Sequence, residues 1–314
     1  MICIAILELE NVVKRFGDVV ALSGLTLSLE RGESLGLVGP NGAGKTTTIR
    51  VSLGILRRDA GRVALFGEDP WTRPEVRRRV GVVHERPAFV EGMRVLEWLE
   101  RVCDIYGVDR SEARRVLELV ELWDVRRRKI RALSAGMRQR LALAQALVHD
   151  PELLILDEPF TNLDPPTRTR FIEILGRVKS ERSLTLLITS HTLSDVLSLS
   201  SRIAVISRGR IVFRGSPEDV ERALGASIVR VRCSNPRALA EVLRGVEGVR
   251  RVEVVDEQTL VMEVEASRRA SLLKTIASVS EERGVTVFDV ETRAPEIEEL
   301  IRRVGGVGSS RGGG

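Results

Sequence analysis

The sequence predicts an α/β domain ending near residue 225, followed by a small α+β domain with a ferredoxin-like order of elements. Three observations support this prediction. The chain has 314 residues, more than one ordinary domain needs, and 43% of them are hydrophobic, enough for packed cores. Short apolar, strand-like runs alternate with helical stretches from residue 6 to about residue 225. Beyond that point the composition changes and strands and helices follow in another order.

Composition excludes several classes of protein. No window approaches eighteen consecutive apolar residues, and the N-terminus lacks the basic region of a secretory signal. We therefore expect a soluble, cytoplasmic chain that needs a partner for any membrane role. The three cysteines, Cys3, Cys103 and Cys233, are odd in number and far apart, which argues against a disulfide framework and a zinc cluster. The net charge of +5 is modest and favours a solvated surface over a site for nucleic acid or for an anionic membrane face.

The first expected elements are strands at residues 19–22, 25–29 and 34–38, with turns at 23–24 and 31–32. The third strand leads directly into a glycine-rich loop, and a helix can follow it. A loop at such a junction is typical of a phosphate-binding loop, because its main-chain N–H groups and the helix N-terminus can surround phosphates. The candidate nucleotide-binding residues are Gly39, Pro40, Asn41, Gly42, Ala43, Gly44, Lys45, Thr46 and Thr47.

Four side chains have separate expected roles in catalysis. Lys45 would neutralise the β- and γ-phosphates, and the hydroxyl of Thr46 would ligate Mg²⁺. Downstream, the apolar strand 153–156 ends in two carboxylates, which point to opposite sides of the strand. Asp157 would complete the metal shell, and Glu158 would polarise the attacking water. No guanine-reading Asn-Lys-x-Asp segment occurs, so ATP is favoured over GTP.

A third segment indicates the family. Residues 133–137 read Leu-Ser-Ala-Gly-Met and precede a helix-prone stretch, so Ser134 is a plausible N-cap. Together with the phosphate loop and the two carboxylates, this segment resembles the signature motif of the ABC ATPase family, and the resemblance covers residues 7–225. It implies a P-loop NTPase fold of ABC type, in which one subunit completes the ATP site of another in trans. The residues contributed in trans would be Ser134, Ala135, Gly136 and Met137.

The resemblance implies roles for four more residues. Phe16 falls at the A-loop position, whose ring stacks on adenine, and Glu85 at the Q-loop position. Asp164 matches the D-loop. His191 follows an apolar strand-like run and matches the switch histidine, which senses the γ-phosphate and partners Glu158.

Two departures from the family pattern indicate one branch. Ala135 and Met137 differ from the usual Leu-Ser-Gly-Gly-Gln, and Glu85 replaces the usual Q-loop glutamine. Both variants resemble the ATP-binding subunits of ABC-2-type exporters. The resemblance implies a Mg-dependent ATPase, peripheral on the cytoplasmic face of the cell membrane. Its partners would be a membrane-spanning permease subunit and a second ATP-binding subunit, with no nucleic acid. A homodimer is favoured, and a heterodimer stays open. Whether Glu85 contacts Mg²⁺ stays open.

The segment from about residue 85 to 148 is predicted to be mostly helical, with apolar residues at helical spacing in 95–99 and 113–120. This insert resembles the family's helical subdomain, and a coupling helix of the transporter would dock in the groove beside Glu85. The basic run 126–129 is predicted to be a solvated surface rather than a lipid or nucleic-acid patch.

Residues 226–304 predict a βαββαβ accessory domain for dimer contact or regulation, and 305–314 a disordered Gly/Ser tail. Asn235 and Pro236 mark the start of its first helix, and Ser267 could cap the second. The expected strands are 228–231, 249–255, 260–264 and 285–290, and a final helix spans 294–304.

Two alternatives remain. The first is a soluble, non-transport ABC ATPase in cofactor assembly, translation or DNA repair. Only about ninety residues separate Gly44 from Ser134, too few for the long coiled coil of a repair ATPase, and a translation type would carry two cassettes. The second alternative is a non-catalytic nucleotide-binding regulator, which the intact Lys45, Glu158 and His191 argue against.

Overall fold

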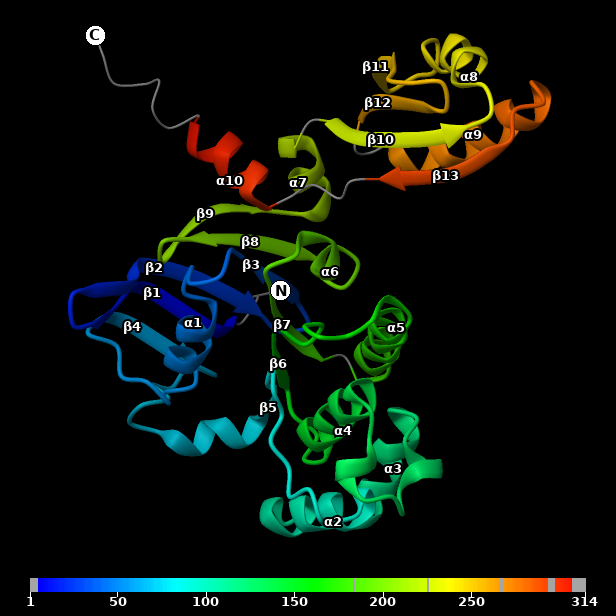
Figure 1. The fold of residues 1–314 in the computed structure, drawn as a ribbon. Helices are drawn as coiled ribbons and strands as arrows, with labels where there is room; N and C mark the ends of the chain where they lie inside the picture. Colours follow the sequence, from blue (N-terminus) through cyan, green and yellow to red (C-terminus); the bar gives the residue numbers. More distant parts are fainter. Residues whose placement is uncertain (1–4, 183, 225, 266–267, 293–296, 307–314) are drawn as a thin grey trace, which may run out of the picture. The chain divides into compact units, whose positions relative to one another are not determined.

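The computed structural model describes residues 5–182, 184–224, 226–265, 268–292 and 297–306 (Figure 1). Contacts divide the chain into two compact units, Met1–Arg214 and Gly215–Gly314. This division lies ahead of the expected boundary at residue 225. The reason is that α7 (Pro217–Leu224) packs on α10 (Ile297–Gly306), which belongs to the second unit.

The first unit contains an antiparallel sheet in the order β2-β1-β4, made of β1 (Ala5–Phe16), β2 (Val19–Glu30) and β4 (Ala60–Leu65). The prediction of a turn at residues 23–24 was wrong. Both expected strands belong to β2, and Gly24, at a φ of 75°, lies in a bulge where the register with β1 shifts. Pairing with β1 continues on both sides, so the chain bends without reversing.

A second sheet of the first unit runs in the order β5-β6-β7-β3-β8-β9. The strands from β5 to β8 along this order are parallel, so their carboxyl ends meet at one edge. Three of them, β3, β6 and β7, are buried along their whole length, as expected for parallel strands covered on both faces. The bounds are Val80–Val83 (β5), Leu153–Asp157 (β6), Thr185–Ser190 (β7), Ser34–Val38 (β3), Arg202–Ser207 (β8) and Arg210–Gly215 (β9).

Helix α1 (Lys45–Ser52) lies between the two sheets, in contact with strands of both. Helices α2 (Val95–Tyr106), α3 (Ser111–Leu119) and α4 (Ala135–Leu147) contact one another and form a group to one side of the sheets, as Figure 1 shows. We call them the helical group. Two further helices, α5 (Pro165–Arg182) and α6 (Leu193–Leu197), complete the first unit. Within the described part of the chain, every helix is too short or too polar to span a lipid bilayer.

The second unit has the predicted βαββαβ order, and its sheet runs β11-β12-β10-β13 with antiparallel neighbours, which confirms a ferredoxin-like arrangement. Asn235 caps its first helix by accepting a hydrogen bond from the Ala238 N–H at 3.2 Å. Ser267, the first residues of the expected final helix and most of the expected tail lie outside the described residues. The elements are β10 (Ala226–Cys233), α8 (Pro236–Leu243), β11 (Val249–Val254), β12 (Thr259–Glu265), α9 (Arg269–Glu282) and β13 (Val287–Thr292).

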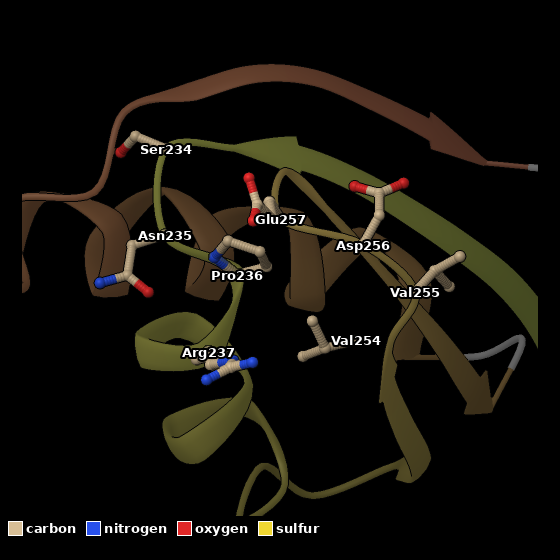
Figure 2. Close-up of a pocket in the computed structure, with 8 residues that line it drawn as sticks. All are labelled: Ser234, Asn235, Pro236, Arg237, Val254, Val255, Asp256 and Glu257. Carbon is tan, nitrogen blue, oxygen red and sulfur yellow. The ribbon is translucent and has the colours of Figure 1, made fainter.

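A hollow of about 430 Å³ lies in the second unit between the start of α8 and the turn that joins β11 to β12. Figure 2 shows Arg237 on one side of it and Asp256 and Glu257 on the other. These three charged side chains are exposed, and the Gln258 N–H holds the pKa of Asp256 below its usual value by donating to its carboxylate. The hollow therefore presents both signs of charge to solvent.

The packing of the helical group against the parallel sheet depends on a glycine. Gly81 lies in β5, and a Cβ atom at this position would overlap the carbonyl oxygen of Ala146 in α4. In contrast, Gly176 in α5 has open space around the position of a Cβ atom. The absence of a side chain at Gly81 is what lets α4 lie against β5.

We expect Gly81→Ala to lower the free energy of unfolding of the first unit by about 1–3 kcal/mol, because helix and strand must move apart. Gly176→Ala, the matched control, is expected to raise it by about 0.5–1 kcal/mol through helix propensity. Urea unfolding followed by tryptophan fluorescence measures both, since Trp71, Trp98 and Trp123 all lie in the first unit. A Gly81→Ala midpoint at or above that of the parent would contradict the close packing.

Candidate functional site

The glycine-rich loop connects the end of β3 to the start of α1, as its sequence predicts. Gly42 and Gly44 turn it with φ values of 79° and 112°, a region that residues with a Cβ rarely adopt. At Gly44 a Cβ atom would also lie 2.8 Å from the carbonyl oxygen of Ala21. The loop borders a cavity of about 250 Å³, the loop cavity, lined by Ala21, Asn41, Gly42, Gly44, Lys45, Thr46, Thr47, Glu85 and Glu158.

Lys45 is buried beside this cavity, with 6% of its surface exposed. Its ammonium donates hydrogen bonds to the carbonyl oxygens of Gly39 and Pro40, at 2.5 and 3.2 Å. It also forms an ion pair with Glu158, with 3.1 Å between Nζ and Oε1. Because a buried ammonium is stable only when its charge is compensated, these three contacts fix its position.

The end of β6 brings Asp157 next to the loop. Its Oδ1 accepts a hydrogen bond from the Thr189 hydroxyl at 2.8 Å and lies 3.4 Å from the hydroxyl of Thr46. A carboxylate and a hydroxyl at this separation are hard oxygen donors of the kind that Mg²⁺ prefers. The residues present therefore fit a magnesium ion held between β6 and α1.

Glu158 has a strained backbone, with a φ of 50° in the left-handed region that non-glycine residues seldom adopt. Its N–H donates to the Thr189 hydroxyl at 3.0 Å. Its Oε2 lies 2.8 Å from Nδ1 of His191 and 3.3 Å from the His191 N–H. The carboxylate of Glu158 is thus held between a lysine on one side and a histidine on the other.

Several predicted residues lie away from the loop cavity. The four signature residues are not among its lining, and neither are Phe16 and Asp164. Ser134 caps α4 by accepting from the Met137 N–H at 3.3 Å, and both Ser134 and Ala135 are exposed. Phe16 is 49% exposed and lies at the end of β1, where it pairs with Val19 of β2. Val19 precedes Ala21, which lines the loop cavity, by two positions.

Asp164 caps α5 by accepting a hydrogen bond from the Thr167 N–H at 2.8 Å, which lowers the pKa of its carboxyl. Thr167 in turn lies against Gly136, where a Cβ atom would overlap its side chain. The predicted signature segment and the D-loop residue Asp164 are therefore connected within one chain through Thr167.

Sequence reasoning missed two features that support the site. Thr189, a polar residue in a buried strand, bonds to both Asp157 and Glu158. Asp195 is 5% exposed and accepts from Arg168 Nη1 at 3.0 Å and from the Ser190 hydroxyl at 3.1 Å. Burial raises the pKa of the Asp195 carboxyl above its ordinary value, while Arg168 opposes that shift. The polar Thr189 at the end of an apolar strand was a signal, whereas nothing in the sequence pairs Arg168 with Asp195.

Comparison with known proteins places this geometry in a family. The family model described as "ABC transporter" matches residues 22–161. The Nod factor export ATP-binding protein I of Burkholderia orbicola is 39% identical over 246 residues, which cover 76% of this chain and 81% of the relative. The chain belongs to the ABC transporter family. The predicted resemblance is thereby confirmed, and membership in this family of ATPases implies ATP binding and hydrolysis.

Other ABC relatives match over nearly the whole chain. The daunorubicin resistance ATP-binding protein DrrA3 of Streptomyces coeruleorubidus is 34% identical, with 96% of each chain covered. The linearmycin resistance ATP-binding protein LnrL of Bacillus subtilis is 30% identical over 96% of this chain and 98% of the relative. Among solved structures, an ABC transporter ATP-binding cassette in its ADP conformation is 27% identical with a TM-score of 0.61, over 69% of this chain and 92% of that one. The predicted fold class is confirmed.

We expect Arg168→Met to lower the free energy of unfolding at pH 7 by about 1–3 kcal/mol, since it leaves the buried Asp195 carboxylate without its cation while Arg168 itself is partly exposed. The pKa of Asp195 should rise further. Because the folded chain would then bind this proton more tightly than the unfolded chain does, the loss should shrink as the pH falls from 7 to 5.

Urea unfolding at both pH values, followed by tryptophan fluorescence, tests this expectation. Arg168→Met/Asp195→Asn is the control, because an amide can keep the Ser190 hydrogen bond without a charge and should make the loss independent of pH. An equal loss at pH 5 and pH 7 in Arg168→Met would show that the Asp195 charge is not the cause.

Proposed function

We propose that this chain is the ATP-binding subunit of an ABC exporter. In this proposal two such subunits form a homodimer on the cytoplasmic face of the membrane and hydrolyse ATP at their interface. Hydrolysis then drives a separate membrane-spanning permease subunit. The observation that carries the catalytic part is the arrangement of Lys45 and His191 on opposite sides of the Glu158 carboxylate.

ATP is the substrate that this arrangement suits. The turned loop presents main-chain N–H groups at the start of α1, which suits a triphosphate. The triphosphate would compete with Glu158 for the Lys45 ammonium, because both are anions within reach of Nζ. Once Lys45 binds phosphate, Oε1 of Glu158 is free of its cationic partner, and the carboxylate can accept a proton from the attacking water. Nucleotide binding would therefore activate the base.

His191 keeps Glu158 in place during this exchange. Its ring Nδ1 and its main-chain N–H both contact Oε2, so the carboxylate remains oriented when Oε1 loses Lys45. The opposite edge of the imidazole is then available to a γ-phosphate, in agreement with the predicted sensor role. His191 is in this view a positioning residue for Glu158 that also contacts the substrate.

Thr46 and Asp157 would hold Mg²⁺, since their oxygens lie 3.4 Å apart beside the loop cavity. The ion supplies positive charge to phosphate oxygens when bound. Thr189 orients Asp157 for this role by donating to the same oxygen, Oδ1. Glu85 also lines the cavity and pairs with Arg86 at 3.6 Å, and we propose that it contributes a second carboxylate near the nucleotide.

The dimer is proposed because the signature residues do not line the loop cavity of their own chain. Ser134 is exposed at the N-terminus of α4, where main-chain N–H groups favour an anion. A second copy could present Ser134 and Gly136 to the γ-phosphate, and Phe16 would pack on adenine beside Ala21. ATP would then stabilise the closed dimer, and its hydrolysis would release it. Asp164, in contact with the signature through Thr167, would lie at the same interface.

Export is supported by the names of the relatives, which are a Nod factor export protein and two antibiotic resistance proteins. These names favour the exporter over a soluble, non-transport ATPase.

We propose that the helical group, roughly the expected insert at residues 85–148, contacts the permease beside Glu85. The predicted accessory domain, residues 226–304, would serve dimer contact or regulation. Mass spectrometry of proteins that co-purify in mild detergent tests the proposal, and recovery of soluble partners alone would overturn it.

We expect Glu158→Gln to reduce ATP turnover by about 10²–10⁴-fold, because the general base is lost while the amide keeps the shape of the side chain. The variant should remain a dimer with ATP and dissociate without it. Phosphate release and light scattering measure the two effects. Glu152→Gln, just before β6 and paired with surface arginines, is the matched control and should behave as the parent. A Glu158→Gln chain that binds ATP but stays monomeric would exclude the closed dimer.

We expect Asp157→Asn to remove the dependence of nucleotide affinity on Mg²⁺. In the parent, titration with a fluorescent ATP analogue should give tighter binding with Mg²⁺ than with EDTA. In the variant the two affinities should become equal, since one of the two hard oxygen donors is neutral. A variant with the full Mg²⁺ effect would show that Asp157 does not hold the ion.

A further inference from the structure

Two segments that adjoin the helical group, around residues 93–95 and 128–130, run side by side although they are distant in sequence. The Ile130 N–H donates to the Met93 carbonyl at 2.9 Å, and the Val95 N–H donates to the Arg128 carbonyl at 3.1 Å. Arg94 and Lys129 form an isolated antiparallel bridge between the segments. The basic run expected at residues 126–129 is thereby joined by cations from outside it.

These contacts gather five exposed cations, which we call the basic surface: Arg94, Arg127, Arg128, Lys129 and Arg131. In the described part of the chain none of the five forms an ion pair. Arg126 does not belong to the set, because its guanidinium lies 4.3 Å from the Trp123 ring centroid and donates to the Trp123 carbonyl. The basic surface therefore concentrates positive charge that no carboxylate balances.

Neighbouring arginines of the helical group behave differently. Arg110 pairs with Asp104, and Arg114 with Glu118. Glu91, three residues before Arg94, forms an ion pair with Arg138, which holds the pKa of its carboxyl below the usual value. Of the remaining acids close in sequence to the two segments, Glu97 accepts a hydrogen bond from the Arg94 main-chain N–H at 3.4 Å, and among the described residues neither Glu97 nor Asp124 forms an ion pair with a side chain of the basic surface.

Stability of the fold does not explain this placement. Arg94 is the N-cap of α2, and the carbonyls of Arg126 and Arg128 accept from the first N–H groups of that helix. The N-terminus of a helix is the positive end of its dipole, where cations are unfavourable and acids are favoured. A cluster of cations at this position costs stability, which indicates that it serves binding.

We propose that the basic surface binds the anionic lipid headgroups of the membrane that holds the transporter. This inference rests on the proposed function, in which the helical group faces the permease. All five side chains are exposed, so they suit a layer of many phosphates better than one enclosed ligand. Attraction to an anionic leaflet acts within a Debye length of about 8 Å at physiological salt. Val90, 53% exposed and bonded through its carbonyl to the Met93 N–H, adds an apolar contact beside the cations.

Vesicle flotation with the full-length chain tests the proposal without a permease. The probes are vesicles of phosphatidylcholine alone and vesicles containing about one third phosphatidylglycerol. The test variant replaces the five residues of the basic surface by glutamine. The matched control replaces Arg230, Arg237, Arg244, Lys274 and Arg283, which are also four arginines and one lysine, exposed and without an ion pair in the described chain.

We expect the parent and the control to float with anionic vesicles only, and to be released by 0.5 M salt. The test variant should bind at least tenfold more weakly, with unchanged ATP turnover and a melting temperature no lower than that of the parent. The proposal would be overturned if the test variant bound anionic vesicles as well as the parent does. It would also be overturned if the control lost as much vesicle binding as the test variant, because the position of the cations would then not matter. Failure of the parent to bind anionic vesicles would also overturn it.

Failure of the lipid proposal and failure of the proposed exporter function would give different results. If the parent binds no vesicles and the test variant loses the permease in detergent pull-downs, the basic surface binds an acidic segment of the protein partner instead. If anionic binding depends on the basic surface but no permease co-purifies, the lipid assignment stands and the exporter proposal fails.

Discussion

The position of β7 between β3 and β6 is the constraint on which the candidate site depends. Because the strands are parallel, all three end at one edge, and the end of β7 touches both neighbours. The Gly39 N–H donates to the Ser190 carbonyl at 3.2 Å, which ties the glycine-rich loop to β7. On the other side, Thr189 bonds to Asp157 and to the Glu158 N–H. One buried strand thus sets the distance between the loop that suits phosphate and the carboxylates that suit metal and water.

The backbone at the same edge of the sheet is strained at Glu158, and contacts of this residue stabilise the strained conformation. A left-handed backbone at a non-glycine residue costs on the order of 1–3 kcal/mol, and Glu158 adopts it because its N–H and both carboxylate oxygens have partners. Behind this residue, the buried contact of Arg168 with Asp195 connects α5 to α6, and Asp195 in turn holds the hydroxyl of Ser190. The site is therefore supported from the side opposite the loop cavity by a second set of charges.

Features encoded in short segments could be predicted from the sequence, and features that need distant contacts could not. The glycine-rich loop and the strand ending at Asp157 are each visible within a few consecutive residues. The βαββαβ order follows from a series of such short segments along the chain. The β2 bulge was mistaken for a turn because Ser23-Gly24 has turn composition, and only pairing with β1 decides otherwise. The contact of Arg168 with Asp195, and the position of Arg94 beside Lys129, join residues that share no pattern. The division at Arg214 depends on α7 packing on a helix far along the chain.

The close contact of Gly136 with Thr167 has a mechanical consequence. At Gly136 the start of α4 packs directly on the Thr167 side chain at the start of α5, so a relative shift of the two helix ends meets a clash or leaves a void at this contact. Ser134 and Asp164 each cap one of these ends and are therefore coupled through Gly136 and Thr167. A displacement of either helix strains this contact, so a neighbouring molecule that binds at one cap also acts on the other.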